Sequence, residues 1–179
     1  MTLVVNFNAG PGAGKSSTAA SVFAELKWRG VNCELVTEFA KDLVWEEHIN
    51  GLQFQQYIFS QQLHRMERLR GKVDVILTDS PLLFSLVYNP NIPKAFEDYV
   101  LYCYESWDNL DIFLKRMKPY HAVGRVQTEE QARELDKRIH DIFMKIKMPL
   151  IELKGVKENN VLIANIIEEA LKNESKSIS

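Results

Sequence analysis

The sequence has few cysteines and no long hydrophobic run. Cys33 and Cys103 are its two cysteines in 179 residues, and they stand far apart in no metal-ligand spacing. Two isolated thiols are typical of a reducing compartment and support neither a disulfide framework nor a thiolate metal site. No apolar stretch approaches the roughly 20 residues that cross a bilayer. The apolar N-terminal residues also lack the basic segment of a signal peptide, so we expect a cytoplasmic protein.

An excess of charge of either sign is absent too. Lys and Arg together number 22 and Asp and Glu number 24, which leaves a formal net charge of −2. Such a protein is a poor candidate for non-specific coating of DNA, because that affinity depends on many cations meeting phosphates. Hydrophobic residues make up 46% and charged residues 26% of the chain, the balance of a soluble globular protein. We expect one domain over residues 1–173 and a polar tail over residues 174–179.

Short apolar runs alternate with segments of helical periodicity along the chain. The runs that predict strands cover residues 3–7, 33–36, 73–78, 111–114 and 150–153. The segments that predict helices cover residues 19–26, 53–70, 132–146 and 163–171, and Thr128 with Gln131 forms a capping box before the third. This alternation predicts an α/β sandwich of three layers, with helices on both faces of a mainly parallel sheet. Ligands of such folds bind at the carboxyl ends of the strands.

A glycine-rich turn separates the first expected strand from the first expected helix. It follows the phosphate-binding pattern GxxxxGK[ST], except that Ala9 replaces the first glycine. In this pattern backbone N–H groups point at phosphate oxygens, and the helix adds the positive end of its dipole. Lys15 would reach the β- and γ-phosphates, and the Ser16 hydroxyl would complete a Mg²⁺ shell. The position between strand and helix favours a P-loop over a chance turn. The residues expected to bind the nucleotide are Gly10, Pro11, Gly12, Ala13, Gly14, Lys15, Ser16 and Ser17.

Two carboxylates follow expected strands. Asp79 comes directly after the best strand of the sequence, from which it would face the P-loop. It would hold Mg²⁺ through water or take a proton from an attacking hydroxyl, although a turn-capping role is the alternative. Glu38 follows the second strand and lies close to Lys41, so it is either a second cleft carboxylate or half of a solvated ion pair on a helix. The residue pattern does not decide which carboxylate would be the base.

A basic stretch lies between the fourth expected strand and the third expected helix. Between residues 115 and 125 it contains Lys115, Arg116, Lys118, His121 and Arg125. In a P-loop protein we expect this stretch, near residues 115–127, to form a lid over the phosphates, because the planar fork of arginine binds two phosphate oxygens. A solvated basic loop is the alternative.

Several of these segments resemble one family. AGPGAGKSS, VTEFAKDL, VILTDSPLL and FLKRMKPYHAVGRVQTEEQ are similar to phage and bacterial P-loop kinases related to ribosylnicotinamide kinases and to nucleoside and nucleotide kinases. The resemblance covers about residues 3–153. It implies ATP as the phosphoryl donor, Asp79 at the acceptor hydroxyl or the metal, and Arg116 and Arg125 in the lid. It also implies the sheet order 2-3-1-4-5 and, for a phage protein, the host cytoplasm.

The expected function is therefore that of an ATP- and Mg²⁺-dependent kinase. Lys15, Mg²⁺ and the lid arginines would neutralise charge on the transferred phosphoryl group, and Asp79 and Glu38 would serve the acceptor or the metal. The acceptor would be a nucleoside, a nucleotide or a modified base, since some phage relatives act on hydroxymethyluracil within DNA. An ATP-hydrolysing switch that moves a bound partner is the alternative from another class.

Overall fold

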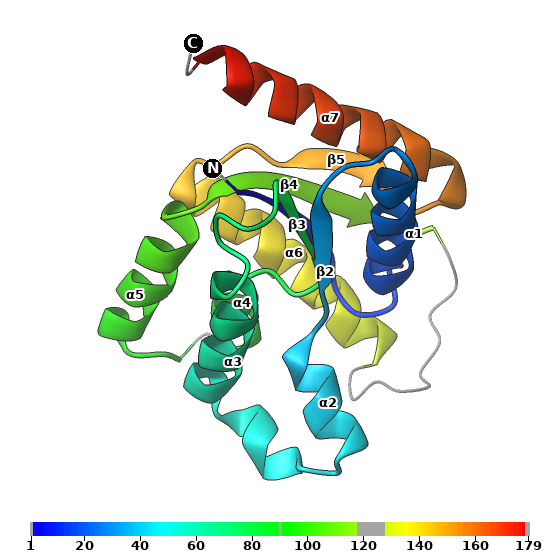
Figure 1. Cartoon of the computed structure of the whole chain (residues 1–179). Coiled ribbons are helices and arrows are strands. Elements are labelled where there is room, and N and C mark those ends of the chain that lie inside the picture. The colour runs from blue at the N-terminus through cyan, green and yellow to red at the C-terminus, as the bar shows by residue number, and fades with distance from the viewer. Residues whose placement is uncertain (1, 90, 118–127, 178–179) are drawn as a thin grey trace.

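The chain folds around one parallel sheet, as the sequence predicts (Figure 1). A computed structural model describes residues 2–89, 91–117 and 128–177. The five strands are β1 Leu3–Asn8, β2 Cys33–Val36, β3 Val75–Thr78, β4 Asp108–Lys115 and β5 Ile151–Lys154. Their order is β2-β3-β1-β4-β5 and all four pairings are parallel, which confirms the expected topology. Every strand therefore points its carboxyl end toward the same edge.

Helices cover both faces of the sheet and complete the three layers. They are α1 Lys15–Trp28, α2 Phe39–Trp45, α3 Gln55–Glu67, α4 Phe84–Tyr88, α5 Lys94–Glu105, α6 Glu129–Ile146 and α7 Asn160–Ser177, with 3₁₀ turns at Ile49–Gln53 and Lys157–Asn159. Figure 1 shows α1 and α7 on one face and α3, α4 and α6 on the other. Within the described ranges no helix combines the length and the apolar character that crossing a membrane requires.

The alternation of side chains along β1 divides the core in two. Val4 packs with residues of α3, α4, α5 and α6, whereas its neighbours Leu3 and Val5 pack with residues of α1 and α7. This is the period of two that a strand imposes. Both faces of β1 are buried, so its sequence is continuously apolar up to Asn6.

The helix α6 begins where the sequence predicts. The Thr128 hydroxyl accepts a hydrogen bond from the backbone N–H of Gln131, and the Gln131 side chain accepts one from the Thr128 N–H. This capping box satisfies two N–H groups that the first turn would otherwise leave unpaired. It fixes the start of the helix whose next turns pass beside the P-loop.

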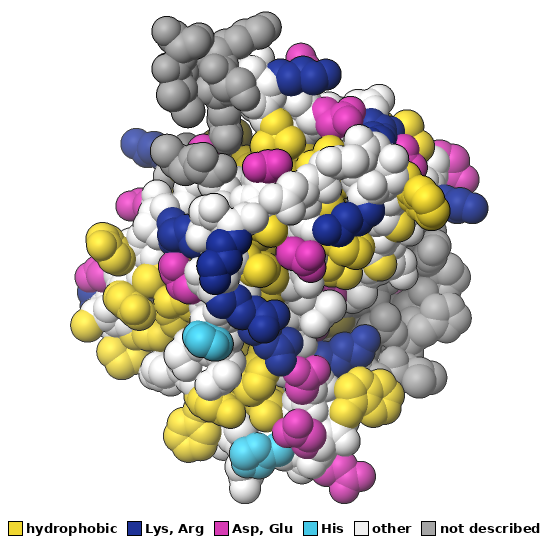
Figure 2. Space-filling view, viewed as in Figure 1, with side chains coloured by type: hydrophobic (Ala, Val, Ile, Leu, Met, Phe, Trp, Pro, Cys, Tyr) yellow, Lys and Arg dark blue, Asp and Glu magenta, His cyan; other side chains and the backbone are white. Residues whose placement is uncertain are grey.

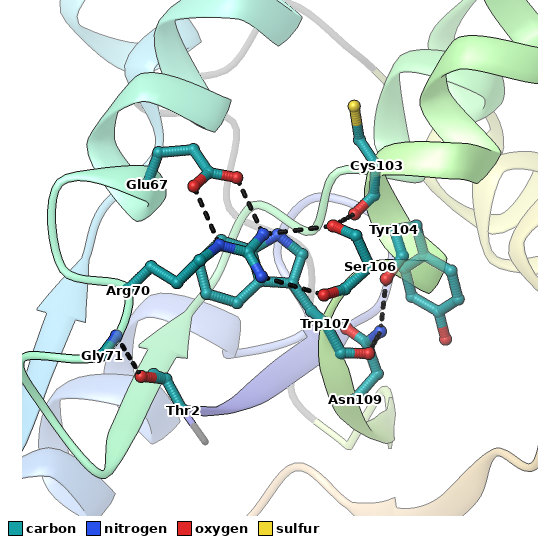
Figure 3. A network of polar contacts seen from close by, with 9 residues as sticks. All are labelled: Thr2, Glu67, Arg70, Gly71, Cys103, Tyr104, Ser106, Trp107 and Asn109. Atoms are coloured by element: carbon teal, nitrogen blue, oxygen red, sulfur yellow. Dashed lines mark hydrogen bonds and ion pairs between the residues drawn. The ribbon is translucent and has the colours of Figure 1, made fainter.

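At the edge opposite the P-loop, Arg70 joins the end of α3 to the turn between α5 and β4 (Figure 3). Its guanidinium carbon lies 3.3 Å from the centre of the Trp107 ring, and one of its nitrogens donates to the Ser106 carbonyl at 2.9 Å. Glu67 pairs with the same guanidinium group. Stacking and ion pairing together position one cation. At this edge the Arg70 guanidinium group is therefore used for contacts within the protein.

A second polar network is buried between β1, β4 and α5. Asp111 is only 4% exposed; its carboxylate accepts hydrogen bonds from the Tyr104 hydroxyl at 2.6 Å and from the Asn8 side-chain amide at 3.0 Å. Burial raises the pKa of Asp111 to about 6, although both hydrogen bonds oppose this shift. Asn109 helps to explain why β4 begins three residues before the expected run at 111–114: its side chain is hydrogen-bonded to Asn6 and to the Tyr104 carbonyl.

We expect Asp111→Asn to change how stability depends on pH. The folded protein keeps the Asp111 proton up to about pH 6, whereas the unfolded chain releases it near its ordinary pKa of about 4. The contribution of this group is therefore fully present at low pH and falls as the pH rises through this window. Relative to wild type, the variant should gain about 2 kcal/mol in free energy of unfolding between about pH 4 and pH 7.5.

Urea unfolding of both proteins at the two pH values measures this difference. The amide that the substitution introduces still accepts from Tyr104, and Asn8 has a buried Oδ1, without a partner among the described residues, to offer the new N–H₂ group. Asp108→Asn, at the half-buried start of the same strand, is the control and should show no such gain. A stability difference between the Asp111 variant and wild type that does not vary with pH would contradict the prediction.

Candidate functional site

The P-loop connects the carboxyl end of β1 to α1. The strand ends at Asn8 and the helix begins at Lys15, so the loop is short and turns sharply. Gly12 and Gly14 have φ angles of 80° and 101°, in the left-handed region that residues with a side chain rarely adopt. These two glycines, rather than the missing glycine at Ala9, allow the turn. Ala9 is fully buried and packs in the core.

The Lys15 ammonium group lies inside the curve of this loop. Nζ donates to the Ala9 carbonyl at 2.7 Å and lies 3.3 Å from the Gly10 carbonyl. Burial lowers the pKa of Lys15, an effect that the charges of Glu38 and Asp79 oppose. The ammonium is thus held by neutral carbonyls, with carboxylates farther away. A phosphate at the loop would offer it a stronger partner.

Glu38 and Asp79 are brought to the same edge as the loop. Val36 of β2 pairs with Thr78 of β3, so the residues that follow both strands emerge together. Burial raises the pKa of Glu38, and Lys15 opposes this shift more strongly than Lys41 does. Glu38 lines the cavity beside the P-loop, as the interpretation of Glu38 as a cleft carboxylate expects, and Lys41 lines it too. Asp79 is 4% exposed, and its Oδ1 has no hydrogen-bond partner among the described residues.

Gln62 links the segments that carry these two carboxylates. Its side-chain oxygen accepts from the Phe39 N–H at 3.1 Å, and its amide nitrogen lies 3.4 Å from the Thr78 hydroxyl. It is buried on α3 between Phe59 and Met66, where the helical stripe is otherwise apolar. Sequence reasoning missed Gln62. The signal was a polar residue on the buried face of a helix, a position that needs hydrogen-bond partners.

A cavity of about 500 Å³ opens beside the loop. One side is formed by P-loop residues from Pro11 to Ser17 and by Glu38. The other side contains Lys41, Gln55 and Gln62 but is largely apolar and aromatic; its larger apolar and aromatic side chains are Trp45, Leu52, Ile58, Phe59, Leu82, Phe84 and Tyr88. These residues come from α2, α3, α4 and the connections between them. A cavity with one polar, phosphate-binding wall and one aromatic wall is suited to a planar organic group next to a phosphate.

The residues expected to hold Mg²⁺ fit that ion. Ser16 presents its hydroxyl from the first turn of α1, and Asp79 has a buried carboxylate oxygen that is not otherwise paired among the described residues. Both are hard oxygen donors. The described residues form no cluster of three or more His, Cys, Asp or Glu around one point. Mg²⁺ at nucleotide sites uses one or two protein ligands, with phosphate oxygens and water as the others.

Arg116 packs against the P-loop directly after β4. Its side chain is 7% exposed, and it donates to the Pro11 carbonyl at 2.7 Å. It also pairs with Asp136 of α6 at 3.1 Å. Lys115 is the last residue of β4 and pairs with Glu152 of β5. The described beginning of the basic stretch is therefore a strand end that packs against the P-loop, while residues 118–127, with Arg125, lie outside the described residues.

Two close backbone contacts confine the loop. A Cβ atom on Gly10 would lie 2.2 Å from the Ala132 carbonyl oxygen of α6. A Cβ atom on Gly155, in the turn after β5, would lie 2.6 Å from the Ala13 carbonyl oxygen. Neither position has room for a larger residue, because the opposing atoms are backbone. The loop is thus enclosed by parts of the chain that follow it by more than a hundred residues.

Figure 2 shows one face of the molecule, on which Lys and Arg side chains gather near the centre with acidic side chains between them. Two of the protein's cations form ion pairs: the half-buried Arg65 with Asp42, and the exposed Lys27 with Glu34. On this face of the described residues, basic and acidic side chains are therefore mixed.

One comparison with known proteins identifies a related family. The model of a family described as AAA domain matches residues 5–159, which include the P-loop, both carboxylates and α6. No curated protein matches the chain. The match places the glycine-rich loop in the context of a nucleotide-binding domain, in agreement with the geometry.

Proposed function

Because the chain belongs to this AAA-domain family of P-loop proteins, we propose that it is an ATP- and Mg²⁺-dependent kinase. It transfers the γ-phosphoryl group of ATP to a hydroxyl or phosphate group. The acceptor is a nucleoside, a nucleotide or a modified base. The observation that carries the proposal is the cavity beside the P-loop. ATP hydrolysis needs only water as acceptor, whereas this cavity has an aromatic wall in addition to its phosphate-binding wall. That wall suits a base or a comparable ring.

For a hydroxyl acceptor, the residues divide the reaction between them. The acceptor oxygen forms a bond to the γ-phosphorus while the bond from that phosphorus to the β–γ bridging oxygen breaks, and ADP leaves. Glu38 lines the cavity and is our candidate for the base that receives the hydroxyl proton, because burial raises its pKa toward the range of an effective base. Lys15 compensates charge on the phosphates.

Asp79 and Ser16 are our candidates to hold Mg²⁺, which when bound would neutralise phosphate charge. Asp79 follows β3, which pairs with the strand that leads into the P-loop, and this supports a role at the nucleotide's metal. Gly10 to Ser17 would bind the triphosphate. We further propose that Arg125 meets the phosphates from the segment before α6. This division leaves the acceptor itself to be identified.

Transfer of label from γ-labelled ATP tests the proposed function. Separate reactions contain pools of nucleosides, pools of nucleotides, and DNA with hydroxymethyluracil. DNA with thymine in its place is the matched control. We expect label on one pool only. Label released solely as inorganic phosphate, at a rate that no acceptor changes, would refute the kinase and favour an ATP-hydrolysing switch.

A further inference from the structure

Asp136, on the second turn of α6, contacts the P-loop backbone directly. Its Oδ1 accepts a hydrogen bond from the Gly10 N–H at 2.5 Å. Its Oδ2 pairs with Arg116, and the same guanidinium group donates to the Pro11 carbonyl. Asp136, Arg116 and the loop backbone thus form a closed set of contacts. It holds the start of the P-loop at the Gly10 N–H and at the carbonyl of the next residue, Pro11. Asp136 takes no part in the pairing of the strands, so its contacts with the P-loop need an explanation of their own.

Burial makes these contacts strong. Arg116 and Asp136 have side-chain exposures of 7% and 21%, so water competes little for their hydrogen bonds. A carboxylate that accepts from a backbone N–H forms a charge-assisted hydrogen bond, about twice as strong as a neutral one. Arg116 compensates the charge of Asp136 and orients its second oxygen away from the loop. The pair therefore directs one carboxylate oxygen at one backbone N–H.

The backbone of α6 packs so closely against Gly10 that there is no room for a side chain between them. The Ala132 carbonyl, one turn before Asp136, lies where a Cβ of residue 10 would be. Gly10 can approach the helix only because it has no side chain, and in that position its N–H faces Asp136. A shift of α6 along or away from the sheet would therefore move the start of the P-loop or break this hydrogen bond.

We propose that Asp136, held by Arg116, is a positioning residue for nucleotide binding: it fixes the start of the P-loop so that the later N–H groups of the loop, from Gly12 to Ser16, keep the curvature that binds phosphate. Pre-organised N–H groups bind an anion without first losing conformational freedom. Asp136 itself does not touch the nucleotide. The inference rests on the nucleotide-binding part of the proposed function and is independent of the acceptor.

The test compares nucleotide affinity with thermal stability in the full chain. Calorimetry with Mg²⁺ and a non-hydrolysable ATP analogue gives Kd, and thermal unfolding without nucleotide gives Tm. We expect Asp136→Ala to weaken binding about ten- to a hundredfold, as for loss of one charge-assisted hydrogen bond. Asp136→Asn retains an oxygen for the Gly10 N–H and should lose less. Asp141→Asn, an exposed position on the same helix, is the control and should bind as wild type.

A double variant separates positioning from a structural role. In Asp136→Leu with Arg116→Met, two apolar side chains replace a partly buried ion pair, a change that is often tolerated without loss of stability. We expect Tm to return close to wild type while the affinity stays low, because no acceptor is left for the Gly10 N–H. Recovery of both quantities, or wild-type affinity in Asp136→Ala, would overturn the inference. Failure of the wild-type protein to bind any nucleotide would instead count against the proposed function.

Discussion

Lys15→Ala should lower phosphoryl transfer by at least about a thousandfold. The Lys15 ammonium is buried inside the loop, where its only hydrogen bonds among the described residues go to two backbone carbonyls. Its charge is therefore available to the phosphates, and the low local dielectric makes that charge more effective than a solvated one. Charge on the transferred group is greatest in the transition state, so the rate should fall more than the affinity for ATP.

Single-turnover transfer beside nucleotide affinity measures the two effects separately. Lys27→Ala is the matched control, because it makes the same substitution at an exposed position in the last turn of the same helix. It should leave transfer unchanged. Circular dichroism establishes that the Lys15 variant is folded. A folded Lys15 variant with wild-type turnover would show that this loop does not serve the reaction.

Asp79→Asn is expected to reduce transfer by about a hundredfold or more and to raise the Mg²⁺ concentration that half-saturates the rate. The change conserves shape but removes the charge from an oxygen that is buried and without a partner among the described residues. Asparagine keeps the size of the side chain and adds an N–H₂ group, and no hydrogen bond to Oδ1 among the described residues is lost. The variant should therefore stay folded and melt close to the wild-type temperature.

Asp74→Asn provides the control at the other end of the same strand, where the side chain is exposed. Glu38→Gln provides the contrast within the site. If Glu38 is the base and Asp79 serves the metal, the Glu38 variant loses rate without a change in Mg²⁺ dependence and loses the acid limb of the pH profile. The opposite pattern would exchange the two roles. Rates for the Asp79 variant within a few-fold of wild type would leave Asp79 as a turn cap.

The sequence predicts the sheet and the P-loop because both depend on local patterns. Apolar runs mark all five strands, and the glycines of the loop determine its shape within a few residues. The helices α2, α4 and α5 are not among the segments that periodicity predicts. The first two span seven and five residues, too few to establish a period. In α5, however, Val100, Cys103 and Tyr104 form a buried stripe at helical spacing, so the sequence does contain a signal for this helix.

The features around the loop are harder to predict, because they depend on contacts between distant residues. Asp136 occupies a helix face that resembles an ordinary polar surface, and only packing shows that it meets Gly10. Arg116 stands in a basic stretch, which suggests an exposed lid instead of a buried contact with Pro11. The aromatic wall of the cavity is assembled from several short segments, none of which carries a motif of its own.

The contacts that enclose the P-loop have a consequence for biosynthesis. The residues that hold or border the loop, Arg116, Asp136 and Gly155, are synthesised more than a hundred residues after the loop itself. Contacts between residues so far apart in sequence form late, because a long chain must close before they contribute. During synthesis the loop therefore exists as an unconfined glycine-rich segment. It acquires its enclosed form only after α6 and the turn after β5 have emerged and packed against it.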